Sequence, residues 1–200
     1  MRSFILAAGL AALLGALPAL AQAPQGTPTN VRGKIVKLAG QTLTVKMRDG
    51  KTADIALAPN GAVLALARKK LSDIKSGDYI ASSAVPGKDG KLHALEIHFL
   101  APTSPEGQRP WDLRKDSVMT NAHVTGIAKV TGGTDIALTY KGQSTDIVVG
   151  PKTIIVSPAP ASMADLKPGK TVFLFANKAA DGSLSARVAF VEKNGVKPPL

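Results

Sequence analysis

The sequence contains no cysteine, so no disulfide framework, thiol nucleophile or thiolate metal site is available to the protein. Aromatic residues make up only 4% of the chain, and Trp111 is its one tryptophan. Proteins that bind single-stranded nucleic acid stack its bases on aromatic side chains, so we expect nucleic acid not to be a partner. Without disulfides, the fold must be held by burial of apolar side chains.

Long apolar runs are absent except near the N-terminus, where one extends from Phe4 to Leu14 after Met1-Arg2. This run is too short to span a bilayer permanently. Small residues ending in "ALAQA" follow it, which is the pattern of a secretory signal peptide. Cleavage after Ala21 or Ala23 fits the pattern, and Ala21 is favoured because Pro24 would directly follow the second site. The sequence therefore predicts a periplasmic or secreted protein with no transmembrane span in its mature chain.

Acidic residues are scarce relative to basic ones, with 14 Asp and Glu against 25 Lys and Arg. A basic surface attracts anionic partners such as lipid headgroups or polysaccharide. The densest basic cluster is "LARKKL", and it is predicted to lie in a long loop. Its charged side chains, Arg68, Lys69 and Lys70, are the polyanion-binding candidates. Another envelope protein is the alternative kind of partner.

Signatures of catalysis are also missing. The chain has no Gly-x-Ser-x-Gly elbow that would present a serine nucleophile, and it has no phosphate-binding glycine loop. Its aspartates mostly occupy turn or capping positions: Asp49 and Asp89 lie beside turn glycines, and Asp165 lies in a predicted helical turn. We therefore expect a protein that is not an enzyme and that needs no cofactor.

An internal duplication is the clearest organisational feature of the chain. "VRGKIVKLAGQTLTVKMRDGKTADIAL" from Val31 aligns with "VTGIAKVTGGTDIALTYKGQSTDIVV" from Val124, which pairs Gly33 with Gly126. Farther along, "LSDIKSGDYI" aligns with "MADLKPGKTV", and "DGKLHAL" aligns with "DGSLSAR". The alignment of "LSDIKSGDYI" with "MADLKPGKTV" places Gly77 and Gly169 in the same turn, where we expect positive φ or very close packing.

Each repeat has the pattern of short strands. Alternation of apolar and polar residues, as in "LTVKM", predicts half-buried strands, and Asp-Gly pairs predict tight turns between them. In "SMADLKPG", Ser162 and Asp165 form a capping box that predicts one helical turn, ended by Pro168-Gly169. Tyr79, Tyr140 and the strand phenylalanines are expected in the cores. The fold class predicted is all-β, with two tandem small OB-like β-barrels, each with one short helical turn, after the signal peptide.

The motifs "(S/A)D(L/I)KxG" and "DGxLxA", present in both repeats, resemble the tandem β-barrel domains of unknown function that are common in bacterial envelope proteins. The segment "RPWD…MTNA" is similar to a group of secreted proteobacterial proteins often named metal ABC transporter permeases. The first resemblance implies a fold and a compartment, and the second implies an association with metal transport. Neither resemblance supplies catalytic residues.

Metal binding is the alternative function, because His and Met suit copper or zinc outside the cell. His98, Met119 and His123 flank the segment between the repeats and converge if that segment folds back. These three residues are the metal-ligand candidates, and a periplasmic protein that handles copper or zinc, accessory to metal transport, is the alternative to a binding or structural module.

The segment between the repeats, residues 101–122, contains three prolines and the single tryptophan, which is not the composition of a flexible tether. We expect Trp111 to pack between the barrels, with Arg109 and Asp112 hydrogen-bonding nearby backbone and Asn121 closing the segment, so that it acts as a clasp. These four residues are the candidates for a ligand site at the barrel seam. The sequence thus predicts a signal peptide (1–21), a flexible segment (22–30), a barrel (31–100), the clasp segment (101–122), a second barrel (123–194) and a tail (195–200).

Overall fold

The computed structural model describes residues 26–198. The expected signal peptide, the first four residues of the expected flexible segment and the last two residues of the expected tail lie outside the described residues. The rest of the expected flexible segment is mostly strand, because residues 27–30 begin the first strand of the sheet. The chain is all-β, as predicted, with two short 3-10 turns as its described helices, η1 (Leu71–Asp73) and η2 (Met163–Asp165). Within the described part of the chain, no helix is long and apolar enough to cross a membrane.

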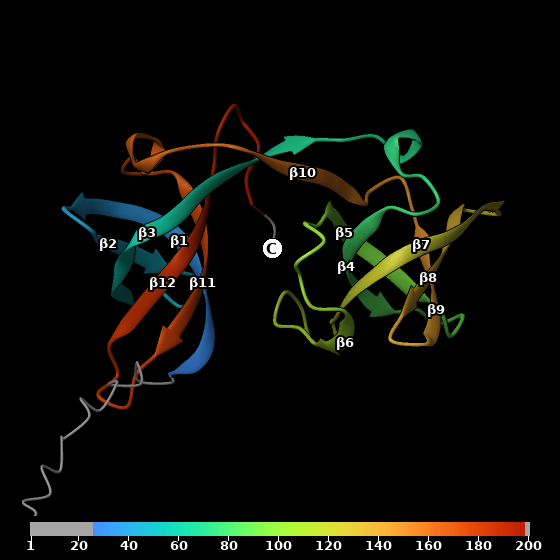
Figure 1. Ribbon diagram of the computed structural model, residues 1–200, viewed down its shortest axis with the longest axis horizontal. Coiled ribbons are helices and arrows are strands. Elements are labelled where there is room, and N and C mark those ends of the chain that lie inside the picture. Colours follow the sequence, from blue (N-terminus) through green and yellow to red (C-terminus); the bar gives the residue numbers. More distant parts are fainter. Residues whose placement is uncertain (1–25, 199–200) are drawn as a thin grey trace, which may run out of the picture.

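Two closed five-stranded barrels stand side by side (Figure 1). The first barrel closes in the order β12-β11-β1-β2-β3 through a parallel β12–β3 pairing. Its strands are β1 (Thr27–Ala39), β2 (Thr42–Met47), β3 (Thr52–Arg68), β11 (Thr171–Lys178) and β12 (Leu184–Val191). Its interior is filled by apolar side chains that include Val31, Leu43 and Leu174.

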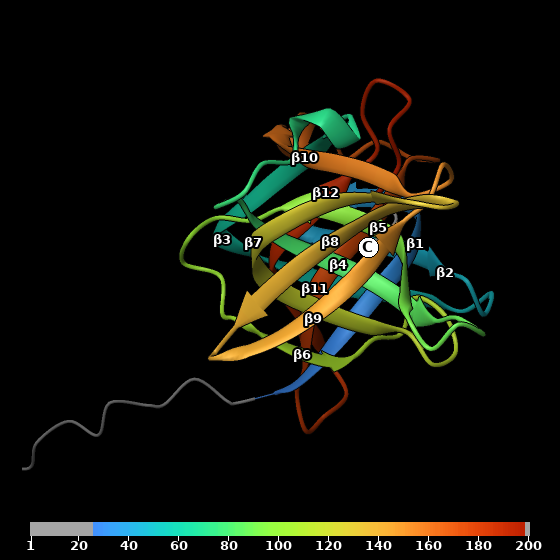
Figure 2. The same ribbon diagram turned by 90° about the vertical axis from the view of Figure 1, so that its right-hand side faces the viewer.

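The second barrel closes in the order β5-β4-β7-β8-β9 through a parallel β5–β9 pairing. Its strands are β4 (Tyr79–Pro86), β5 (Leu92–Phe99), β7 (Val118–Val130), β8 (Gly133–Tyr140) and β9 (Gln143–Val149). Figure 2 places this barrel in front of the first, with β7, β8 and β9 facing the viewer. Its core includes Ile80, Ile97 and Ile136.

The barrels do not coincide with the sequence repeats. β1, β2 and β3 come from the first repeat but close with β11 and β12 of the second. The reciprocal exchange completes the other barrel, where β7, β8 and β9 of the second repeat close with β4 and β5 of the first. The predicted barrels at residues 31–100 and 123–194 are therefore wrong as domain boundaries, because each barrel combines the two halves of different repeats.

The exchange runs through two crossing arms, the end of β3 and β10 (Ile154–Pro160), which join the barrels across one side of the molecule (Figure 1). The arms pair antiparallel, with Leu66 opposite Pro158. These two residues hold equivalent positions in the repeats, so a pseudo-two-fold axis passes between them. Arg68, expected in a loop, ends β3 instead, because the strand continues across to the other barrel.

Equivalent backbone contacts show how the repeats correspond in space. The N–H of Gly77 donates to the carbonyl of Val124, and the N–H of Gly169 donates to that of Ile35. Ile35, rather than Val31, thus occupies the place of Val124 in the other barrel, and the sequence pairing of Gly33 with Gly126 is wrong in the first strand. The reason is a difference in hairpin length: both hairpins end in two-residue turns, but β7 pairs from Gly126 to Val130 beyond its bulge, whereas β1 pairs only from Lys37 to Ala39.

The short turns follow the predicted chemistry. The backbone N–H of Ser162 donates to the Asp165 carboxylate at 2.9 Å, and Lys70 and Asp73 form the same contact in the first repeat, also at 2.9 Å. Gly77 and Gly169 follow the two turns with φ of 91° and 83°. The prediction of positive φ at both glycines is confirmed.

Replacing Gly77 or Gly169 with Val should each lower the free energy of unfolding by more than about 1 kcal/mol, because a β-branched residue is strained at positive φ. No atom lies within 4 Å of the Cβ that either substitution adds, so the cost is conformational and not steric. Chemical denaturation measures it. Gly126→Ala, whose Cβ meets only Ala137 Cβ at 3.5 Å, is the control, and equal stability of all three variants would contradict the assignment.

The strand exchange predicts that neither repeat folds alone. Separate polypeptides for residues 26–103 and 104–198 should each lack a cooperative thermal transition, because each leaves two sets of strand edges unpaired. Mixed or co-expressed, they should form a one-to-one complex with the circular dichroism spectrum of the intact chain. A cooperative melt of either fragment by itself would show that the repeats close independently.

Candidate functional site

The outer faces of the two barrels face each other beside the crossing arms, bridged by the segment between the repeats, and we call the region between them the seam. A third apolar cluster, outside both barrel cores, fills its upper part and includes Phe173, Phe190 and Trp111. Phe173 and Phe175 contact edge to face, with ring centroids 4.7 Å apart. Phe173 and Phe190 are buried, as expected of core residues, but in this outer cluster and not inside a barrel; Phe175, expected in a core, is 41% exposed. The three rings form an aromatic wall on the first barrel.

The opposite wall, on the second barrel, is polar. Glu96 and His98 lie on the outward face of β5, where Glu96 is 1% exposed and His98 is 7% exposed. His98 Nδ1 lies 3.6 Å from Glu96 Oε1. Neither Glu96 oxygen has a hydrogen-bond partner among the described residues, and the same holds for the buried Ser83 hydroxyl. The sequence pattern did not single out Glu96.

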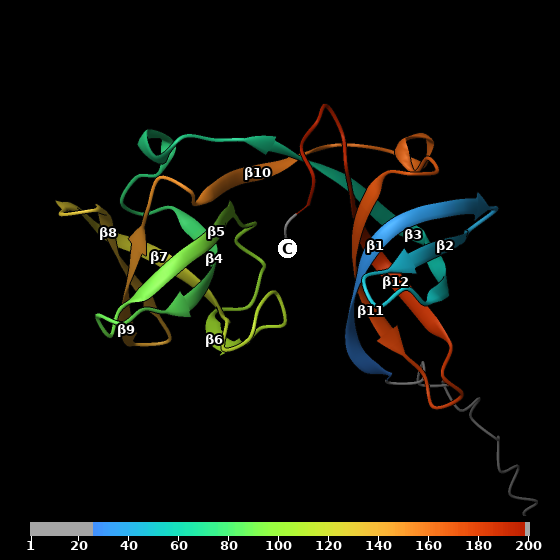
Figure 3. The same ribbon diagram turned by 180° about the vertical axis from the view of Figure 1, so that it is seen from behind.

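The segment between the repeats is fixed to both barrels. It contains β6 (Gly107–Pro110), which pairs with β7, and β7 begins at Val118 and not at 123. The name clasp segment is used below for residues 101–117. Figure 3 shows it extending from the second barrel towards the first.

On the second barrel, three contacts hold the start of the clasp segment. The Tyr79 hydroxyl donates to the Ser104 carbonyl and the Asn121 amide donates to the Pro105 carbonyl, both at 2.9 Å. Glu106 accepts from the backbone N–H of Lys141 at 2.8 Å. Burial, followed by the negative charge of Glu106, raises the pKa of Tyr79, so its hydroxyl stays a donor at neutral pH. Asn121 closes the segment in the way that the sequence suggested.

On the first barrel, Trp111 and Asp112 make the contacts. The Trp111 ring lies 6.4 Å from that of Phe173 and 6.3 Å from that of Phe175, and Arg32 stacks on it at 5.4 Å. Asp112 accepts from the Arg32 guanidinium at 2.6 Å and from the Asn30 amide at 2.9 Å. Asp112 thus accepts hydrogen bonds from side chains of β1, whereas it was expected to hydrogen-bond nearby backbone groups.

Arg109 is held at the seam by Trp111, with its guanidinium carbon 5.2 Å from the ring centroid. No ion pair of Arg109 occurs among the described residues, and Asp112, its expected neighbour, binds Arg32 instead. Partial burial lowers the pKa of Arg109, but a guanidinium remains charged at neutral pH.

A pocket of about 500 Å³ opens at the seam between the two walls and the clasp segment. We call it the seam pocket. The first barrel contributes Leu64, Phe175, Val188 and Phe190, the second contributes His98, Phe99, Met119 and Asn121, and the clasp segment and its neighbours contribute Leu100, Ala101, Ser104, Pro105 and Arg109, with Pro158 from a crossing arm. Pockets of this volume, apolar with a few polar groups, are typical binding sites for small molecules.

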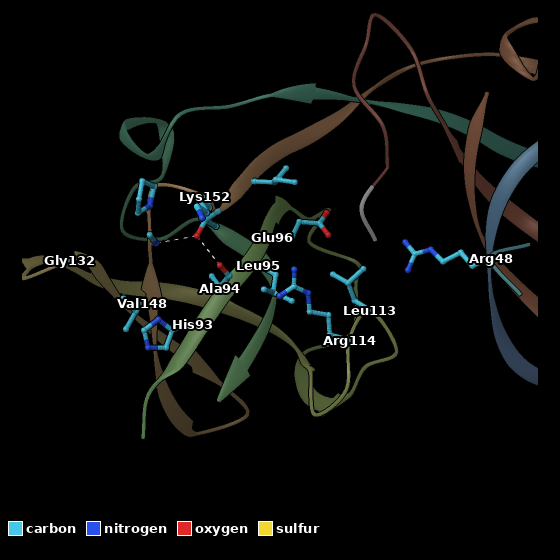
Figure 4. A pocket seen from close by; sticks show the side chains of 14 residues that line it. Arg48, His93, Ala94, Leu95, Glu96, Leu113, Arg114, Gly132, Val148 and Lys152 are labelled. Atoms are coloured by element: carbon cyan, nitrogen blue, oxygen red, sulfur yellow. Dashed lines mark hydrogen bonds between the residues drawn. The ribbon is translucent and has the colours of Figure 1, made fainter. Parts of the chain in front are cut away.

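A second opening, of about 660 Å³, lies on another side of the seam. Arg48 extends towards it from the first barrel, while Glu96, Leu113 and Arg114 lie on the other side (Figure 4). Lys152 adds a third cation to its lining. The three basic side chains are exposed, so solvent screens their charges. They therefore define this opening less than the aromatic wall defines the seam pocket.

The metal candidates do not converge. His98 lies opposite Ala81 on one side of β4, and His123 lies opposite Tyr79 on the other side. The Tyr79 ring stacks on His123 with centroids 4.6 Å apart. His98 and Met119 line the seam pocket, whereas His123 faces Glu106. Within residues 26–198, no group of three or more His, Asp or Glu side chains is placed to hold a metal ion.

The polyanion candidates occupy a crossing arm and its continuation. Arg68 ends β3, and Lys69 and Lys70 lead into η1; all three are exposed. They lie away from the seam pocket, whose lining includes none of them. Any binding to anionic lipid or polysaccharide there would be separate from the seam.

Replacing Asp112 with Asn should destabilise the protein by about 1 kcal/mol. This is the upper part of the range for partly exposed ion pairs, because Asp112 is half exposed but its partner Arg32 is buried. Burial raises the pKa of Asp112, but hydrogen bonds from Arg32 and Asn30 outweigh it and leave the pKa below its ordinary value. The stabilisation is therefore present above the unfolded-state pKa and lost as pH falls through the folded-state pKa.

Urea denaturation of wild type and Asp112→Asn at neutral and acidic pH checks this expectation. Asp116→Asn, in the same loop but with an exposed side chain, is the control. A stability difference for Asp112→Asn that does not shrink at low pH would contradict a role for its charge.

Comparison of the chain with protein-family models, with curated proteins and with solved structures gives no match.

Proposed function

We propose that the protein is a periplasmic or secreted, non-enzymatic binding protein whose ligand site is the seam pocket. The observation that carries the proposal is the origin of the pocket walls, which come from both barrels, a crossing arm and the clasp segment. Neither barrel alone has this site. The N-terminal pattern of a signal peptide supports the location.

The composition of the pocket supports binding over catalysis. Most of its lining is apolar, and its polar members, Arg109, Asn121, His98 and Ser104, are spaced around one cavity. The Asn121 amide already donates to the Pro105 carbonyl and the Ser104 carbonyl already accepts from Tyr79. These groups position the walls, which is the arrangement of a preformed binding site.

The alternative function, handling of copper or zinc, receives less support. It requires His98, Met119 and His123 at one point, and β4 separates the two histidines. A closed structural metal site generally has four well-placed ligands.

A neutral apolar fluorophore, N-phenyl-1-naphthylamine, tests the pocket. We expect it to bind with one-to-one stoichiometry and to accept energy from Trp111, the single tryptophan, which lies next to the pocket residue Arg109. Ala101→Phe places a ring into the pocket lining and should weaken binding by about tenfold or more.

Ala128→Phe is the matched control, because Ala128 is exposed on β7 and outside the pocket lining. Binding that is absent in the wild type, or that Ala101→Phe and Ala128→Phe leave equally strong, would rule out the seam pocket as the ligand site.

A further inference from the structure

The seam pocket has one formal charge in its lining and an apolar interior. Arg109 is its single Lys or Arg, and the lining contains neither Asp nor Glu. Leu64, Phe175 and Phe190 supply apolar lining from the first barrel. A ligand complementary to this lining has an apolar body and a negatively charged group at one end.

Arg109 is placed to meet that group. It is the one member of β6 in the pocket lining, and it remains accessible to solvent. Stacking on Trp111 holds it in position without using its N–H donors. A guanidinium binds carboxylate or phosphate through two parallel hydrogen bonds.

Two of the carboxylates nearby are already occupied, and the third lies outside the pocket lining. Asp112 binds Arg32 and Asn30, and Glu106 binds the backbone of Lys141 and faces His123. Glu96 lies outside the pocket lining. Within the described part of the chain, Arg109 therefore has no competing anion, whereas the comparable cation Arg32 has Asp112.

We propose that the seam pocket binds amphipathic anions, with the apolar body between the aromatic wall and Phe99 and the carboxylate or phosphate on Arg109. This inference rests on the proposed function, since it names the ligand class of the same pocket. A free fatty acid and the anionic head of a lipid share this chemistry.

Ligands with one alkyl chain and different head groups test the proposal. Dodecanoate, dodecanol and dodecyltrimethylammonium are titrated to displace N-phenyl-1-naphthylamine from the full mature chain, the two ionic ligands below their critical micelle concentrations and dodecanol below its solubility limit. We expect dodecanoate to bind about tenfold more tightly than dodecanol, which corresponds to about 1.4 kcal/mol, and the cation to bind most weakly. Dodecyl phosphate should bind as tightly as dodecanoate. If vesicles of phosphatidylglycerol bind although both single-chain anions fail, the source of the anionic ligand is a membrane, and the assignment to the seam pocket is overturned.

Variants then assign the preference to one residue. Arg109→Gln should reduce the ratio of dodecanoate to dodecanol affinity to near one, and Arg109→Lys should restore part of it. Arg114→Gln removes the same charge from the same segment but outside the seam pocket, and it should keep the wild-type ratio. Thermal melts establish that each variant is folded.

The outcomes separate the two proposals. If neither the neutral fluorophore nor any dodecyl ligand binds, the proposed function fails, and this inference fails with it. If neutral ligands bind but dodecanoate has no advantage over dodecanol, the seam pocket stands and the anion proposal is overturned. Equal losses in Arg109→Gln and Arg114→Gln would also overturn it, because they would reflect the net charge of the protein and not a site.

Discussion

The pairing of β1 with β11 and of β4 with β7 is the constraint on which the rest of the structure depends. Each of these antiparallel ladders joins strands from different repeats, so neither barrel can satisfy its backbone hydrogen bonds within one repeat. The crossing arms follow from this exchange, because β3 and β10 must pass from one barrel to the other. The arms in turn hold the outer faces of the barrels together, and the seam pocket forms there.

Divergence between equivalent positions gives the seam its two different walls. In the corresponding strands β4 and β11, Ala81 and Ser83 of the second barrel occupy the places of Phe173 and Phe175 in the first. In β5 and β12, Glu96 and His98 occupy the places of Val188 and Phe190. Because the two faces occupy equivalent positions in the two repeats, the contrast between a polar wall and an aromatic wall is a difference between the repeats. Positions inside the barrels stayed apolar in both copies.

The sequence predicted the elements better than their connections. Turn glycines and the Ser162–Asp165 capping box depend on neighbouring residues, and both appear as expected. Strand exchange could not be read in the same way, because the same motif precedes β4 and β11, and both strands offer β1 an equivalent partner in equivalent register. The strand from Thr52 to Arg68 is the local feature that favours exchange, because it continues from one barrel to the other. The charges of Arg68 to Lys70 made the end of this strand resemble a loop.

The candidate site was predicted in part. One tryptophan and three prolines are unlike the composition of a flexible tether, and this composition pointed to Trp111 and Asp112. Both residues lie between the barrels. Glu96 was not singled out, and Phe175 and Phe190 were expected in the cores, because alternation within a strand distinguishes two faces but does not reveal that the outer one faces a second barrel.

A cysteine-pair experiment tests the strand exchange most directly, and the chain has no native cysteine to interfere. Lys34 lies opposite Thr171 in the β1–β11 ladder, and Tyr79 holds the place of Thr171 in the other barrel. Under mild oxidation, the account predicts that Lys34→Cys/Thr171→Cys forms a disulfide within the monomer and that Lys34→Cys/Tyr79→Cys does not. An intramolecular disulfide in the second pair but not in the first would show that each repeat closes its own barrel, and would contradict the account.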